Sequence, residues 1–296
     1  MAENSVSYSQ FSMYMQCPKK WEQEYVKNKR VFEQSIHTIF GTAMHETLQN
    51  YLTVMYSHSV KKADQINLGQ YLQDRMAFLY KEAADKTGHF STPKELHEFY
   101  LDGIASLDYF VKNRSLYFPS KQHELLGIET ELKVPLLNNI VFKGYIDVVI
   151  RDNRSGRIRV IDLKTSTRGW NKWQKKDKTK TSQLILYKEF YAKQFEIDVE
   201  MISVEYIILR RKINEDSDWP MKRIQFFEPP SGKPTRNRVA ATFGAFLSES
   251  FTDEGKYIED REFKAITTSA CKYCKYRTDE EICPKKLRIK IPKDAD

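Results

Sequence analysis

Two short apolar segments, each with an aspartate inside it, constrain the fold of this chain more than any other feature of the sequence. They are GYIDVV at 144–149 and VIDLKTS at 160–166, and they contain Asp147 and Asp162. Both segments are rich in Val and Ile, and turn-forming residues separate them. The pattern predicts two consecutive antiparallel strands joined by a short turn, which brings the two carboxylates close together.

The two-residue period of a β-strand assigns these side chains to faces. Asp162 and Lys164 are two residues apart and are expected to share a face. Asp147 is expected to point away from the apolar face of its own strand. That apolar face is predicted to contain Ile146, Val148 and Ile150.

A carboxylate inside an apolar strand is costly unless it is paired or binds a cation. Two close carboxylates repel each other, whereas Mg²⁺ and Mn²⁺ bind such oxygen ligands readily. A neighbouring lysine can stabilise charge that develops on a phosphate. The alternative is an ordinary ion pair between Asp162 and Lys164, and these two segments alone leave both interpretations open.

Other side chains are candidates for the same site. His45 lies on the inward face of a predicted helix and is either a metal ligand or a core histidine. Gln183 and Tyr187 are four residues apart and share a face of a later helix. Glu129 and Glu131, on the preceding strand, either face the same cleft or are solvated.

The wider pattern predicts a mixed α/β fold. Apolar residues at helical spacing predict helices at 7–27 and 40–56 and a mostly helical stretch to about 120. Alternating apolar segments predict strands at 124–134, 139–151, 157–164, 202–210 and 222–228. Two later helices are expected at 181–195 and 234–251. Helices followed by three strands, a helix and a strand indicate a mixed sheet with helices packed on it.

Four spaced motifs together resemble the RecB-like branch of the PD-(D/E)xK nucleases. They are Gly41–His45, Gly144–Asp147, Asp162–Lys164 and Gln183–Tyr187, in the order G-x-x-x-H, G-x-x-D, (D/E)-x-K and Q-x-x-x-Y. The opening stretch SYSQFSMYMQCPKKWEQEY also resembles the start of such nuclease domains. The resemblance extends from about 7 to 284, apart from an insert at about 55–120. It implies a restriction-endonuclease-like αβββαβ core.

The resemblance also implies roles for individual residues. His45, Asp147, Asp162 and the backbone carbonyl of Leu163 would bind Mg²⁺ or Mn²⁺. Lys164 would be catalytic, and Gln183 and Tyr187 would support the site and the DNA. The whole chain, 1–296, would form one nuclease domain. Its parts would be a helical region at 7–120 carrying Cys17 and His45, a catalytic sheet core at 121–230, and a C-terminal helix with a cysteine-rich segment at 231–296.

All four cysteines of the chain fit one further pattern. Cys271, Cys274 and Cys283 lie within thirteen residues, and Cys17 is more than 250 residues away. Four thiolates can hold Zn²⁺ or a [4Fe–4S] cluster. The arrangement resembles iron–sulfur nucleases of the AddB type and the CRISPR spacer-adaptation exonucleases, and this resemblance favours the cluster over zinc. Such a centre would clip the N-terminal helix to the C-terminal tail.

A basic and aromatic stretch, RGWNKWQKKDKTK at 168–180, directly follows the Asp162–Lys164 strand. Lysines can follow phosphates and tryptophans can stack on unpaired bases, so we expect this stretch to contact DNA. The alternative is a solvated loop. The candidate DNA-binding residues are Arg168, Trp170, Lys172, Trp173, Lys175 and Lys176.

Composition excludes several classes of protein. A net charge of +8 permits a nucleic-acid partner without requiring one. No apolar run is long enough to span a bilayer and the N-terminus has no secretory pattern, so we expect a cytoplasmic protein without membrane contact. The sequence has no Walker A motif, and a helicase or integrase-type protein is a candidate partner.

Three functional hypotheses remain at this point. The first is a metal-dependent DNA nuclease, expected to be an exonuclease acting on DNA ends or single strands in recombination, repair, phage DNA metabolism or CRISPR adaptation. The second is a catalytically silent DNA-binding or assembly subunit with a structural metal site. The third is a zinc-bound nucleic-acid module. The complete set of aspartates, lysine and histidine favours the first.

Overall fold

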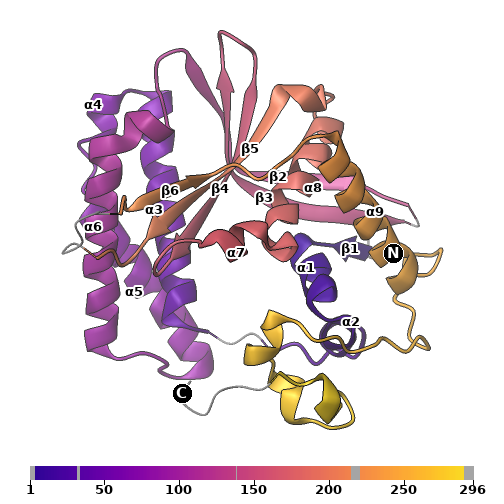
Figure 1. The fold of residues 1–296 in the computed structure, drawn as a ribbon. Coiled ribbons are helices and arrows are strands. Elements are labelled where there is room, and N and C mark those ends of the chain that lie inside the picture. Colours follow the sequence, from indigo (N-terminus) through magenta and orange to yellow (C-terminus); the bar gives the residue numbers. More distant parts are fainter. Residues whose placement is uncertain (1–3, 32–33, 138, 215–220, 290–296) are drawn as a thin grey trace.

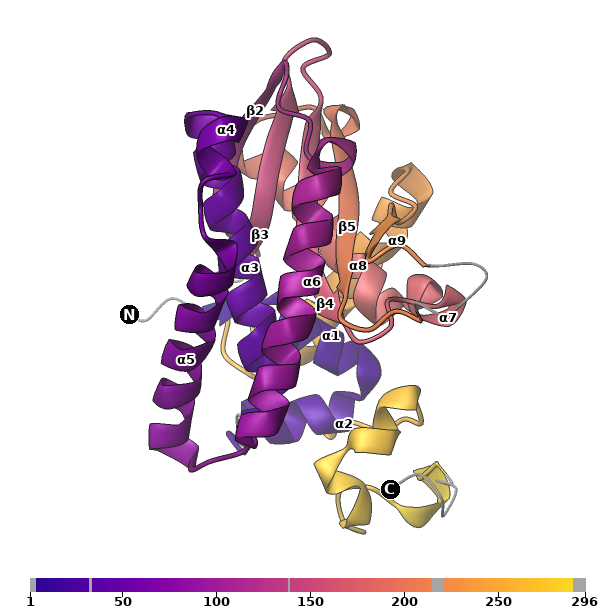
Figure 2. The same ribbon diagram turned by 90° about the vertical axis from the view of Figure 1, so that its left-hand side faces the viewer.

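The computed structural model describes residues 4–31, 34–137, 139–214 and 221–289. A mixed sheet lies between two layers of helices, as Figures 1 and 2 show. The strands are β1 (Asn4–Val6), β2 (His123–Pro135), β3 (Ile140–Asp152), β4 (Ile158–Ser166), β5 (Ile202–Arg210) and β6 (Ile224–Phe227). The α-helices are α1 (Tyr8–Gln16), α2 (Pro18–Trp21), α3 (Ile36–Ser57), α4 (Val60–Ala63), α5 (Leu68–Thr87), α6 (Pro93–Tyr117), α7 (Lys172–Lys176), α8 (Lys178–Gln194) and α9 (Lys233–Ser250).

Strand β3 lies at a fork in the sheet. One of its edges pairs with antiparallel β2 along residues 141–152. The other edge is shared, because β1 pairs in parallel with 140–142 and β4 pairs antiparallel with 148–151. Within the described chain, no strand pairs with that edge at 143–147. Beyond β4 the sheet continues with parallel β5 and antiparallel β6.

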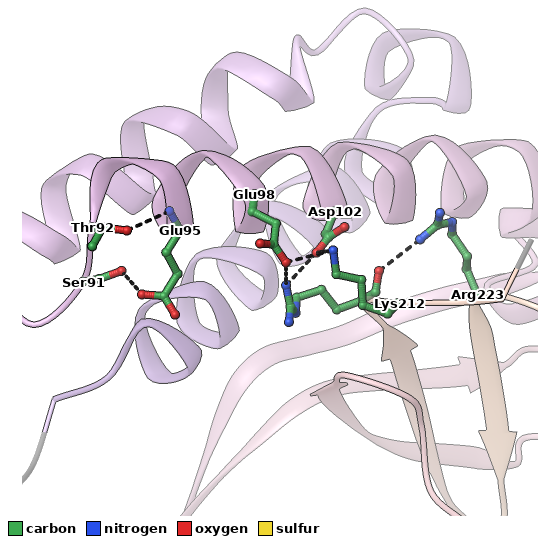
Figure 3. A network of polar contacts seen from close by, with 8 residues as sticks. Ser91, Thr92, Glu95, Glu98, Asp102, Lys212 and Arg223 are labelled. Atoms are coloured by element: carbon green, nitrogen blue, oxygen red, sulfur yellow. Dashed lines mark hydrogen bonds and ion pairs between the residues drawn. The ribbon is translucent and has the colours of Figure 1, made fainter. Parts of the chain in front are cut away.

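One face of the sheet is covered by α3, α5 and α6. Their apolar residues pack with Val148, Ile161, Leu163 and Ile207 from the strands. Ion pairs between α6 and the chain after β5 also join this layer to the sheet (Figure 3). Lys212 Nζ lies 2.9 Å from Glu98 Oε1 and 3.2 Å from Asp102 Oδ2. The stretch predicted as an unassigned insert therefore covers one face of the sheet.

The opposite face is covered by α1, α8 and α9, which form a second core. This core is rich in aromatic rings. The fully buried Trp21 lies with its ring centroid 5.6 Å from that of Phe246 and 5.2 Å from that of Phe263. These contacts join the start of the chain to the segment after α9.

The predicted fold class is confirmed, and most of the predicted elements are present. The differences lie near the N-terminus and directly after β4. The single helix expected at 7–27 is broken at Cys17, whose φ of −166° is extended, because the following Pro18 disfavours a helical residue before it. The sequence analysis missed β1, which has only three residues, and α7. No helix in the described part of the chain is long and apolar enough to cross a membrane.

Candidate active site

The fork in the sheet brings Asp147 and Asp162 opposite each other. The β3–β4 ladder runs from Arg151 paired with Ile158 to Val148 paired with Ile161, where the pairing stops. The next pair in this register would be Asp147 and Asp162. The strands separate at that point, so the two carboxylates lie where the ladder opens.

The Asp147 carboxylate occupies the opening between the strands. Its Oδ2 accepts a hydrogen bond from the backbone N–H of Leu163, at 2.6 Å. The same oxygen lies 3.6 Å from Nδ1 of His45 on α3. Asp147 thereby satisfies a backbone donor of β4 that has lost its partner in β3.

The predicted alternation of β3 breaks at Asp147. Val148 and Ile150 belong to the core under α3, but Ile146 belongs to the core on the opposite face. The expectation that these three residues share a face was therefore wrong for Ile146. The register of β2 places Glu129 opposite Asp147, and Glu129 has a φ of +47°. A residue in the left-handed region disturbs the regular pleat, which explains why the alternation fails at this pair.

Asp162 and Lys164 share one face of β4, as predicted. Asp162 is 3 % exposed, and its Oδ2 lies 2.6 Å from Lys164 Nζ. Asp162 Oδ2 therefore has the Lys164 ammonium as an ion-pair partner. Among the described residues, no donor forms a hydrogen bond of ordinary geometry with this oxygen. The pair predicted as the alternative to a metal site therefore exists, and it leaves a buried carboxylate oxygen with unused acceptor capacity.

Burial raises the pKa of both aspartates. The pKa of Asp147 is raised to about 6, against the lowering effect of Lys164 and the Leu163 N–H. The pKa of Asp162 is also raised to about 6 by burial, and Lys164 opposes this shift. Burial alone would lower the pKa of Lys164, but the two aspartates raise it, so the lysine is a cation at neutral pH.

His45 reaches the site from the middle of α3. The helix begins after Ser35, whose side chain caps it by accepting from the N–H of Thr38. Burial and the charge of Lys164 lower the pKa of His45 to about 4. The imidazole is therefore neutral at neutral pH, with a lone pair available for a metal. Gly41, one turn earlier, permits close packing, because a Cβ there would lie 3.2 Å from Thr165 Oγ1.

Helix α8 supplies Gln183 and Tyr187 from the other side of the fork. Gln183 Nε2 donates to the Tyr187 hydroxyl at 3.4 Å. The tyrosine is 5 % exposed and packs on Gly144, where a Cβ would lie 3.1 Å from its hydroxyl oxygen. Gly144 is thus required by the approach of Tyr187 to the backbone of β3.

Glu129 also lies at the edge of this group. Its Oε1 accepts from Gln49 Nε2 at 2.5 Å, and the same amide lies 3.4 Å from the Asp147 carbonyl oxygen. The charge of Glu129 contributes to the raised pKa of Asp147. Of the two glutamates considered from the sequence, both are exposed on β2, but only Glu129 lies beside the site. The sequence analysis missed Gln49, because only the fold brings α3 beside β2.

The chemistry of these donors fits a hard divalent cation. The carboxylates of Asp147 and Asp162 lie near one ammonium group, with the charge of Glu129 near Asp147, so the site carries excess negative charge, and a neutral imidazole is adjacent. Among the described residues, however, no three His, Cys, Asp or Glu side chains already converge as a ligand set. The residues therefore match the cation in charge and ligand type. To coordinate an ion, their side chains must move closer to one another.

A family comparison agrees with this geometry. The family model of the PD-(D/E)XK nuclease superfamily matches residues 5–284. The chain belongs to the PD-(D/E)XK nuclease superfamily. No curated protein sequence matches the chain. Members of the superfamily are metal-dependent nucleases, and the forked sheet with its aspartates and lysine is the part of this member where such chemistry fits.

The four cysteines of this PD-(D/E)XK member line one small pocket, which adjoins Ile282 and Arg288. Burial raises the pKa of the Cys283 thiol, and nearby Cys271 and Cys274 raise it further. Cys17 reaches the same pocket from the break between α1 and α2. The fold therefore brings together thiols from both ends of the described chain, although they are not yet arranged as a metal-ligand group.

Protein contacts also hold these two ends together. Thr268 Oγ1 donates to the Gln16 carbonyl at 3.1 Å. Lys275 Nζ lies 2.9 Å from the buried Glu24 carboxylate and donates to the Lys29 carbonyl at 3.0 Å. The cysteine pocket is therefore built on an interface that polar contacts already stabilise.

The basic segment after β4 is more ordered than the expected loop. Asn171 and Gln174 form a capping box at the start of α7, which carries Lys172, Lys175 and Lys176. Trp173 is 69 % exposed, as base stacking requires. Trp170 is 8 % exposed, with its ring centroid 4.8 Å from that of Tyr206, so most of its ring packs against the protein and little of it is open to a base. Arg168 lies in the turn between β4 and α7 and is exposed.

Proposed function

We propose that the chain is a divalent-metal-dependent deoxyribonuclease of the RecB-like branch. We further propose that it is an exonuclease acting on DNA ends or single strands. One observation carries this proposal: the half-buried Asp147 and the buried Asp162 lie where the β3–β4 ladder opens, beside a lysine on the same strand as Asp162. A purely structural ion pair needs neither the second buried carboxylate nor the neutral histidine beside it.

The proposed roles follow from the surroundings of each side chain. Asp147 and Asp162 would hold Mg²⁺ or Mn²⁺, with His45 and the Leu163 carbonyl as further ligands. The bound cation would polarise the scissile phosphate and lower the pKa of an attacking water. The Lys164 ammonium would stabilise the charge that develops on the phosphate oxygens. Gln183, with Tyr187 behind it, would orient Lys164 and the strand that enters the site.

We also propose that Cys17, Cys271, Cys274 and Cys283 hold a [4Fe–4S] cluster, with Zn²⁺ as the alternative. Four soft thiol ligands facing one pocket support a thiophilic metal centre. The exposed lysines of α7 and Arg168 would contact DNA phosphates, and Trp173 an unpaired base. Unwinding would depend on a helicase or integrase-type partner in recombination, repair, phage DNA metabolism or CRISPR adaptation.

Incubation with end-labelled linear DNA and with closed circular DNA tests this proposal. Each substrate is offered single-stranded and double-stranded, with Mn²⁺, with Mg²⁺ or with neither. We expect metal-dependent shortening of linear DNA, with single strands degraded first and circles left intact. Cleavage of circular DNA would show that the chain is an endonuclease and not an exonuclease. DNA binding without cleavage under every metal condition would favour the silent assembly subunit.

A further inference from the structure

A groove connects the candidate active site with the cysteine-rich segment. Its volume is about 750 Å³. Lys164 and Thr165 line it from the end of β4, and Ser269 and Tyr273 line it from the C-terminal segment. Helices α1 and α8 complete its walls. The segment that carries three of the four cysteines is therefore also a wall of the groove that leads to the catalytic lysine.

The groove is lined by two cationic side chains and several polar ones. Its lining includes the ammonium groups of Lys164 and Lys180 together with several hydroxyl and amide side chains. Its carboxylate, Asp177, is already used to cap α8, because Oδ1 accepts from the N–H and the hydroxyl of Thr179. Cationic and hydroxyl groups of this kind bind phosphates, which suits the backbone of a nucleic acid.

Tyr273 is the unusual residue of this groove. It lies inside the Cys271–Cys274 motif and is 82 % exposed. A ring so exposed buries little apolar surface, so packing does not explain its position. Lys272 Nζ lies 5.4 Å from the ring centroid, which places a cation beside an open aromatic face. An aromatic ring with an adjacent cation at the edge of a phosphate-binding groove has the chemistry of a base-stacking platform.

We propose that Tyr273 stacks on an unpaired base and positions a single DNA strand in the groove for cleavage beside Lys164. This inference rests on the proposed nuclease function and adds a positioning residue to it. Inside a duplex, neighbouring base pairs cover both faces of each base, so the ring can stack on unpaired bases but not on interior base pairs. The cysteine motif flanks Tyr273 on both sides and therefore fixes where the platform stands relative to the catalytic strand.

The test compares Tyr273→Ala with Tyr273→Phe in the full chain carrying its cysteine-bound metal. Binding is measured in an Asp162→Asn background, so that DNA is not cut. The probe is one fluorescent oligonucleotide, offered as a single strand and as a duplex. We expect Tyr273→Ala to weaken single-strand binding about tenfold, because a loss of that size lies within the range that aromatic stacking contributes per base. Tyr273→Phe should bind like the parent, and duplex binding should not change.

Phe78→Ala is the matched control, because Phe78 is a 52 % exposed aromatic residue on α5, outside the groove lining. It should leave both affinities unchanged. Tyr273→Leu provides a second variant without an aromatic ring, and its single-strand affinity should fall as for Tyr273→Ala. Unchanged single-strand affinity in both variants, or an equal loss on single strand and duplex, would overturn the inference.

The same variants separate this inference from the nuclease proposal. If the parent chain cuts DNA but Tyr273→Ala binds and cuts normally, only the role of Tyr273 is rejected. If the parent chain never cuts DNA but single-strand binding still depends on Tyr273, the nuclease proposal fails and the stacking platform stands. In the active chain, Tyr273→Ala should raise KM for single strands more than it lowers kcat, as expected for a positioning residue.

Discussion

At the scale of single residues, Asp162 and Lys164 show what the alternation of side chains along a β-strand can predict. The period places both on one face of β4, and their 2.6 Å ion pair follows from that placement. The position of Asp147 depends on more than its own strand, because the opening of the ladder and the left-handed Glu129 turn it toward Leu163 and His45. A pattern along one strand contains no information on where its neighbour diverges.

The first prediction concerns the groups that act on the phosphate. Asp162→Asn and Lys164→Met should each lower DNA cleavage ~100-fold or more, because each removes charge from the reacting centre. Both substitutions preserve size, so the protein should still fold, but each removes one partner of the 2.6 Å ion pair and should therefore lower the thermal unfolding midpoint. The measurement is the initial rate on end-labelled DNA with Mn²⁺. Glu131→Gln, an exposed position on β2, is the control and should cleave normally; a fully active Lys164→Met would reject the assignment.

The second prediction concerns the pH dependence of stability without divalent metal. The pKa values of Asp147 and Asp162 are raised to about 6 in the folded chain, above the usual 3.8. The folded state therefore binds more protons than the unfolded state between about pH 4 and 6. As the pH rises through that window, the free energy of unfolding of the protein decreases. His45, with its pKa lowered to about 4, acts in the opposite direction.

The comparison that isolates the carboxylates uses Asp147→Asn/Asp162→Asn. Relative to this double variant, the parent should lose about 2 kcal/mol of unfolding free energy per carboxylate between pH 4 and pH 7, or roughly 5 kcal/mol for the two together. The measurement is denaturant unfolding in the presence of a chelator. A constant difference between the two proteins across this range would show that the carboxylates are not buried as described.

At the scale of elements, the sequence predicts most of the architecture for physical reasons. Long apolar periodicity identifies α3, α5 and α6, and continuous β-branched segments identify β2 to β5. Strand β1 has only three residues, and its pairing with β3 depends on contacts more than 130 residues away, so local pattern cannot reveal it. Helix α7 is short and polar, and its capping box is clear only when the segment is known to be helical.

The third prediction belongs to α7. Replacing Lys172, Lys175 and Lys176 by Gln should weaken DNA binding and flatten its salt dependence, because each phosphate contact releases counterions. If all three contact phosphates, the log–log slope should fall by roughly 2 for single strands. A variant with the same change in net charge, Lys61, Lys62 and Lys81 to Gln on α4 and α5, should keep the parent slope. Equal slopes for the two triple variants would show that α7 is a solvated helix that does not contact DNA phosphates.

At the scale of the whole molecule, contacts join the two ends of the described chain. The break between α1 and α2 places Cys17 in the same pocket as three cysteines more than 250 residues away. Sequence spacing identified the C-terminal three as a group. The packing of Gln16 against Thr268, of Lys275 against Glu24 and of Trp21 against Phe263 accounts for the approach of Cys17 to that group.

The fourth prediction concerns this pocket. Cys17→Ser should be as damaging as Cys271→Ser, because each removes one of four ligands, and the binding energy of the metal contributes to folding. A [4Fe–4S] cluster would make the parent brown, with absorption near ~400 nm after purification without oxygen, whereas zinc would leave it colourless. Both variants should lose bound metal and become sensitive to protease after α9. Asp162→Asn should keep the metal, and a Cys17→Ser protein with the full metal content would reject the four-cysteine site.

The arrangement of the groove has a consequence for folding during translation. One wall is present once β4 and α8 have been made, but Ser269 and Tyr273 belong to the opposite wall, about 80 residues after α8 ends. Domains fold as they leave the ribosome, N-terminal parts first. A nascent chain that has reached only α8 therefore holds the aspartates and lysine without the second wall of the groove. The complete groove forms only after the ribosome has translated the cysteine-rich segment.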